Sequence, residues 1–188
     1  MDKPLKLDLN FALPVSNSDR IPIALRPEQP TDEAFLLHLY ATTRQEELDL
    51  TNWDTATRSA FVKMQFMAMR QGYSAMFPEG QFSIVLLGDL TIGRIVVNRA
   101  KHEIRLVDMA LTPEMRCRGI GSCLVQALQT EARQAGLPLL LHVLKGNRAV
   151  RLYQRLEFQF GDDSGLSHEM TWSPAGQAAH AKAFPQNI

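Results

Sequence analysis

The segment from Asp108 to Ser122 constrains the fold more than any other part of this 188-residue chain. An apolar strand pattern ends in it, Pro113 turns the chain, and Gly119 and Gly121 open an amphipathic helix. A strand that passes through a tight turn into a helix is typical of domains in which helices cover a sheet. The segment therefore predicts a fold of the α/β type.

The rest of the chain adds further strand and helix patterns in a definite order. Strands are predicted over residues 21–26, 81–87, 91–98, 103–111, 138–144, 158–160 and 168–172. Helices are predicted from residue 33 to a polar stretch at 43–52, from residue 54 or 55 to about Gly72, and over 119–135 and 147–156. Three consecutive strands in this order favour a mixed α+β sheet over a doubly wound one.

One apolar run, Pro138 to Leu144, has the composition of a central strand with parallel pairing that is buried on both faces. Residues 1–20 are predicted to be a loosely ordered leader, residues 21–173 a single domain, and residues 174–188 a tail.

Composition excludes several classes of protein. Twenty basic residues balance twenty acidic residues, which gives no overall reason to expect a nucleic-acid or membrane partner. Cys117 and Cys123 have neither disulfide-framework nor metal-ligand spacing. Charged residues interrupt the N-terminal segment, so no signal peptide is expected, and the predicted location is cytoplasmic.

The turn before the third predicted helix has the properties of an anion site. The first amides of a helix lack partners within the helix and carry partial positive charge. Gly119 and Gly121 let a phosphate approach the backbone, and Arg116 and Arg118 add positive charge. A dinucleotide fingerprint would need a third glycine where Leu124 stands, and there is no Walker lysine.

The sequence resembles the GNAT superfamily of N-acetyltransferases. Arg116-Cys-Arg-Gly119-Ile-Gly121 fits the family signature R/Q-x-x-G-x-G/A, and residues 147–158 are similar to its N-x-A-x-x-L-Y-x-x-x-G-F block. Two departures stand out: Asn147 is one residue closer to Tyr153 than in many members, and Glu157 replaces the usual glycine and so is expected to shift the last helical turn. The resemblance implies a mostly antiparallel, twisted mixed sheet of six to seven strands. About four helices flank it, and a cofactor wedge separates two central parallel strands.

The resemblance also implies acetyl-CoA as cofactor, with coenzyme A as product, and no metal. The pyrophosphate would bind the turn, the pantetheine arm would pair with the strand before it, and Asn147 would contact that arm. The implied cofactor residues are Met109, Ala110, Leu111, Arg116, Cys117, Arg118, Gly119, Ile120, Gly121, Ser122, Asn147 and Tyr153.

Tyr153 matches the family tyrosine near the thioester sulfur, which implies a general acid that protonates the leaving thiolate. The family has no fixed base, so His142, Asp108 and a water chain all stay open as proton acceptors. Cys117 is expected to lie at the pyrophosphate, far from the acetyl group, and is not predicted to be a nucleophile.

The first two predicted helices would form the wall of the acceptor site. There Arg44 is a candidate to bind a carboxylate of the acceptor, Glu47 to bind its ammonium, and Trp53 to contact it. Arg44 and Glu47 can instead pair with each other. The expected acceptor is a small-molecule amine or a peptide, and a homodimer is possible. The alternative is a non-catalytic acyl-CoA-binding or interaction module.

Overall fold

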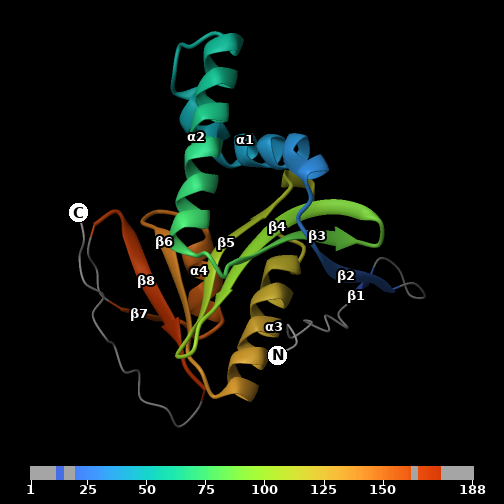
Figure 1. The fold of residues 1–188 in the computed structure, drawn as a ribbon, viewed down its shortest axis with the longest axis vertical. Coiled ribbons are helices and arrows are strands. Elements are labelled where there is room, and N and C mark those ends of the chain that lie inside the picture. The colour runs from blue at the N-terminus through green and yellow to red at the C-terminus, as the bar shows by residue number, and fades with distance from the viewer. Residues whose placement is uncertain (1–11, 15–19, 162–164, 175–188) are drawn as a thin grey trace.

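The computed structural model describes residues 12–14, 20–161 and 165–174. Its strands form one sheet in the order β1-β2-β3-β4-β5-β6-β8-β7 (Figure 1). The strands are β1 (Ala12–Pro14), β2 (Arg20–Pro27), β3 (Gln81–Leu87), β4 (Leu90–Arg99), β5 (Ile104–Leu111), β6 (Leu139–Leu144), β7 (Gln159–Phe160) and β8 (Ser167–Trp172). The helices are α1 (Glu33–Asp49), α2 (Thr55–Met76), α3 (Ile120–Ala135) and α4 (Ala149–Arg155), with 3-10 turns at Pro30–Asp32 and Pro113–Met115.

The mixed, mostly antiparallel sheet is confirmed. Neighbouring strands pair antiparallel except β5 and β6, which are parallel. The seven strands predicted from sequence are all present. The additional strand, β1, pairs with β2 inside the segment expected to be a loose leader. Residues 1–11 and 15–19 of that leader and residues 175–188 of the tail lie outside the described residues.

The parallel pair separates soon after it forms. Residue pairing runs only from Ile104 opposite Leu139 to Leu106 opposite Leu141. From Asp108 onward, β5 pairs with β4 and with no other described strand, and β6 continues along β8. A wedge therefore opens between the C-terminal halves of β5 and β6, as the resemblance implies.

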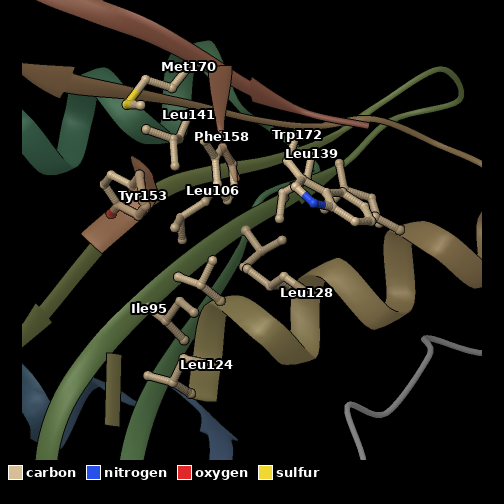
Figure 2. Packing of buried hydrophobic residues seen from close by; sticks show 14 of the residues in the cluster. Ile95, Leu106, Leu124, Leu128, Leu139, Leu141, Tyr153, Phe158, Met170 and Trp172 are labelled. Carbon is tan, nitrogen blue, oxygen red and sulfur yellow. The ribbon is translucent and has the colours of Figure 1, made fainter. Parts of the chain in front are cut away.

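Helices cover the two faces of the sheet. Side chains of successive strand residues point to opposite faces, and Val85 belongs to one hydrophobic cluster whereas Ile84 belongs to the other. The larger cluster joins the sheet to α3 and α4, and Figure 2 shows Leu124 and Leu128 of α3 together with Tyr153 of α4 in it. The smaller cluster joins α1 and α2 to the opposite face.

Two helices are longer than predicted. The polar stretch after residue 43 continues α1 to Asp49, because its side chains pair along the helix (Gln45 with Asp49 at 2.8 Å) and Leu48 is buried. α2 passes through Gly72 and ends at Met76, since one glycine costs a helix only about 1 kcal/mol.

The prediction that β6 is buried on both faces is wrong. Leu139, Leu141 and Val143 are buried, whereas His142 and Leu144 are exposed. The alternation follows from one-sided cover: α3 and α4 pack on the face of the buried residues. His142 consequently lies on an open part of the sheet.

α4 ends in a Schellman motif despite the missing glycine. The amide of Phe158 donates to the carbonyl of Tyr153 at 3.0 Å, and the two rings are 5.6 Å apart. Glu157 occupies the left-handed position, with φ of 65°. The last turn therefore keeps the geometry that a glycine would favour, and the expectation of a shifted turn is wrong.

The Glu157→Gly variant is expected to be more stable than the wild type by about 1 kcal/mol. The left-handed backbone conformation costs a non-glycine residue free energy that glycine does not lose. Urea unfolding at neutral pH would measure the change. Glu157→Ala is the control, since it removes the carboxylate but keeps the Cβ, and it should not be stabilised. Equal stability of all three proteins would contradict the prediction.

Candidate active site

The turn before α3 presents a run of backbone amides without partners. Gly119 precedes the helix in the left-handed conformation, with φ of 82°, and an added Cβ would meet nothing within 4 Å. Among the residues that the structure describes, no group accepts a hydrogen bond from the amides of residues 117–122. Together with the positive end of α3, these amides suit a pyrophosphate.

Arg116 ties this turn to α1. Its Nε donates to the carbonyl of Leu111 at 2.9 Å, and its Nη2 donates to Oγ1 of Thr42 at 2.8 Å. Arg118 and Cys117 are exposed on the turn. Arg116 therefore links the turn to the helix that would cover an acceptor.

The wedge between β5 and β6 starts from the same turn. Met109, Ala110 and Leu111 pair with β4 on one side, and no described strand pairs with them on the other. At the opposite side of the wedge, Oδ1 of Asn147 accepts the amide of Ala149 at 2.9 Å and caps α4. The edge of β5 is thus open to an extended ligand.

Tyr153 is held rigidly where α4 meets the sheet. Its ring is buried in the larger cluster beside Phe158 (Figure 2), and the Schellman motif fixes its backbone. Burial and then the negative charge of Asp108 raise the pKa of Tyr153 to about 12. The phenol therefore stays protonated at neutral pH.

Asp108 forms an ion pair at the centre of the sheet. Its Oδ2 accepts from Nε of Arg94 at 2.8 Å, and Nη2 of Arg94 also donates to the sulfur of Met69 at 3.4 Å. A second phenol lies close by: burial and then Asp108 raise the pKa of Tyr73 to about 12. The negative charge of Asp108 therefore acts on both Tyr153 and Tyr73.

His142 lies on β6, apart from this group. Its Nδ1 is 3.1 Å from Nη1 of Arg105, and its Nε2 is 3.4 Å from Glu169. The side chain is 53% exposed. Partial burial and the Arg105 charge lower the pKa of His142 below its usual 6.5. Asp108 is not among the charges that act on it.

Of the three predicted acceptor residues, Arg44 and Glu47 contact each other, whereas Trp53 packs elsewhere. Arg44 pairs with Glu47 at 3.0 Å on α1. Nε of Arg44 also lies 3.3 Å from the Tyr40 hydroxyl. Trp53 is 42% exposed in the connection to α2, where its ring packs edge-on against Phe61.

Sequence analysis missed Tyr40 as a neighbour of this group, and it placed Tyr73 in the wall of the acceptor site without giving it a role. Each had a signal: Tyr40 is four residues before Arg44, and Tyr73 is four residues after Met69, so each pair shares a helix face. Within the described ranges there is no cluster of side chains that could hold a metal ion. None of the described helices has the length and apolarity needed to span a membrane.

Comparison with known proteins shows which domains the central part of the chain is similar to. Residues 78–160 match the family model described as an acetyltransferase (GNAT) domain. This part of the chain is therefore similar to GNAT acetyltransferase domains. No curated protein matches the sequence.

Solved structures share the fold at low identity. The PaiA N-acetyltransferase of Thermoplasma acidophilum, in complex with coenzyme A, is 15% identical with a TM-score of 0.60, over 80% of this chain and 98% of that one. An acetyltransferase of Thermus thermophilus is 16% identical with a TM-score of 0.58, over 80% and 96%. Ard1 of Thermoplasma volcanium is 20% identical with a TM-score of 0.56, over 81% and 97%.

Proposed function

We propose that this protein transfers the acetyl group of acetyl-CoA to a primary amine. The proposal rests on the occurrence of three features around one wedge. They are the unpaired amides of residues 117–122, the open edge of β5 and the protonated phenol of Tyr153. The same fold in a relative solved with coenzyme A supports the choice of cofactor. Two free cysteines suit a reducing compartment such as the cytoplasm.

The cofactor would bind along the wedge. The amides of residues 117–122 would hold its pyrophosphate, with Arg116 and Arg118 adding charge, and the backbone of Met109 to Leu111 would pair with its pantetheine arm. Asn147 already uses Oδ1 as a cap, which leaves its Nδ2 to donate to that arm. When bound, acetyl-CoA supplies a thioester that is activated towards amines.

In the proposed reaction the neutral amine nitrogen forms a bond to the acetyl carbon, and the carbon–sulfur bond breaks. Tyr153 gives its proton to the departing sulfur, and the second proton that the nitrogen loses as the amide forms returns Tyr153 to its phenol form. Asp108 receives the amine as its ammonium ion and accepts the proton released before attack, which then passes to water. Asp108 is favoured over His142 because it lies on the stretch of β5 that borders the wedge, next to Met109, whereas His142 contacts Arg105 and Glu169.

Calorimetric titration with acetyl-CoA and with coenzyme A tests the cofactor site. Wild type should bind both, and Gly121→Glu should bind at least 100-fold more weakly because its carboxylate would enter the space meant for phosphate. Gly121→Ala is the matched control. A Cβ there meets only Leu152 and Met109 at 3.5 and 3.6 Å, which are ordinary contacts, so binding should persist.

Absence of binding by wild type would overturn the proposal. Binding without thiol release in the presence of any amine would instead support a non-catalytic acyl-CoA-binding module.

His142→Gln is expected to leave the pH dependence of kcat/KM unchanged, because His142 faces Arg105 and Glu169 rather than Asp108 and Tyr153. Initial rates between pH 5 and 9 would measure this. If His142 were the base, the wild-type rate would fall as the pH drops through the lowered pKa of its imidazole. Loss of that acid limb in the variant would assign the proton to His142.

A further inference from the structure

Helix α2 has an outer face that no described element covers. Val62 and Phe66 pack into the smaller cluster, and the opposite side of the helix is exposed along its whole length. Figure 1 shows the N-terminal half of α2 extending beyond the sheet beside α1. Six exposed residues at spacings of four, four, three, four and four form one stripe on this face, about 100° wide. They are Ala56, Ala60, Met64, Met67, Gln71 and Ala75.

The stripe lacks the charges that the solvent-facing side of a helix usually carries. Of the three charged residues of α2, Arg58 and Arg70 form ion pairs with residues outside the helix, and Lys63 is exposed beside the stripe. Two large apolar side chains stand at the centre of the stripe: Met64 is 58% exposed and Met67 is 41% exposed. Protein interfaces are depleted in charge and enriched in methionine. The stripe therefore has the composition of an interface.

The order of residues along the stripe indicates what fits it. The spacings are the same when read from either end of α2, and the residue types also match, except that Ala60 corresponds to Gln71. A second copy of α2 that runs antiparallel therefore places Met64 opposite Met67 and an alanine opposite each terminal alanine. Methionine adapts its shape to a neighbouring side chain, so the centre of such a contact would fill well. The stripe is thus complementary to itself.

Charge favours the antiparallel arrangement over a parallel one. The aligned peptide dipoles make the start of a helix positive and its end negative, so antiparallel helices place opposite partial charges side by side. In a parallel pair Lys63 would face Lys63 of the second copy, whereas in the antiparallel pair it falls opposite Ala68. A phospholipid surface or a nucleic acid is bound through several basic residues, and the outer face of α2 exposes one, Lys63.

We propose that this chain forms a homodimer in which the outer face of α2 packs antiparallel against α2 of a second copy. The twofold axis passes between Met64 and Met67, so the contact is isologous and closed. Met69, which contacts Arg94 of the candidate site, lies on the inner side of α2 with the smaller cluster. Association through the stripe therefore leaves the contacts of α2 with the sheet unchanged. The inference goes beyond the proposed function and does not depend on it.

Sedimentation equilibrium of the full chain tests the dimer. Wild type should be a dimer at micromolar concentrations. The double variant Met64→Glu, Met67→Glu should raise the dissociation constant about 100-fold or more, because four carboxylates would meet at the axis. Met76→Glu is the matched control: Met76 is 71% exposed on the same helix but lies outside the stripe, so its dimer should persist. Circular dichroism checks that each variant folds, as expected for changes at exposed side chains.

Single cysteines test the register of the two helices. They are introduced into the Cys117→Ser variant, because Cys117 is exposed whereas Cys123 is buried. With a rise of about 1.5 Å per residue, Met64→Cys lies about 5 Å along the axis from its copy and should be cross-linked by a short bismaleimide. Ala56→Cys lies about 28 Å from its copy, so it should be cross-linked only when co-expressed with Ala75→Cys.

Three results would overturn the inference. They are a monomeric wild type, a dimer that survives the double substitution, and cross-linking through Ala56→Cys alone. Binding of a monomeric wild type to phospholipid vesicles, lost in the double variant, would assign the stripe to a membrane surface and would overturn the dimer as well.

Discussion

Tyr153→Phe is expected to lower kcat by about 10²- to 10⁴-fold, the usual contribution of a positioned general acid. The phenol is the only group changed, and its pKa near 12 keeps it protonated across the working pH range. A thiolate that departs without this proton must be released as an anion beside the Asp108 charge. Single-turnover measurement of thiol release at saturating acetyl-CoA would isolate this step.

The variant should fold and bind cofactor normally. The hydroxyl of Tyr153 has no hydrogen-bond partner among the described side chains, whereas its ring packs in the core and remains in phenylalanine. The calorimetric affinity for coenzyme A and the unfolding midpoint serve as controls. A kcat within threefold of wild type, with both controls unchanged, would remove Tyr153 from the reaction.

Asp108→Asn is expected to lower kcat/KM for the amine by about 10²- to 10⁴-fold, because the ammonium loses its counter-charge and its proton acceptor. The affinity for coenzyme A should change little, since the phosphate-binding amides lie beyond the end of β5. Steady-state rates at varied amine and fixed saturating acetyl-CoA would measure the effect.

Glu103→Gln separates catalysis from stability in this test. Glu103 pairs with the buried Arg105 at 2.8 Å, as Asp108 pairs with Arg94, and the two acids are 21% and 20% exposed. Both variants remove a carboxylate that pairs with a buried guanidinium, so both should be destabilised. Only Asp108→Asn should lose activity, and equal activity losses would assign the effect to folding.

The sequence predicted the elements whose signals are local. The turn and start of α3 followed from Gly119 and Gly121, and the end of α3 followed from Gly136, which adopts the left-handed conformation. The wedge was predicted only through the family resemblance, because the pairing between β5 and β6 joins residues about 35 positions apart.

The features that escaped prediction depend on tertiary contacts. A register shift between β4 and β5 pairs Val96 with Asp108 and Val97 with Leu106. This shift determines which side chains of β5 share a face. No residue type in the strand predicts the shift. The exposure of His142 likewise depends on which face of β6 the helices cover, which its own apolar neighbours do not reveal.

The three-pair seam between β5 and β6 divides the molecule into two half-sheets that are joined weakly through their backbones. The pantetheine arm of coenzyme A, if it lay extended in the wedge, would add backbone hydrogen bonds between the two half-sheets. The donor substrate would then also hold the two half-sheets together. Ligand at 100 times its Kd stabilises a folded protein by about 2.7 kcal/mol. Amide hydrogens of Val143 and Met109 should then exchange more slowly when coenzyme A is bound, which makes cofactor supply a determinant of the protein's lifetime as well as its rate.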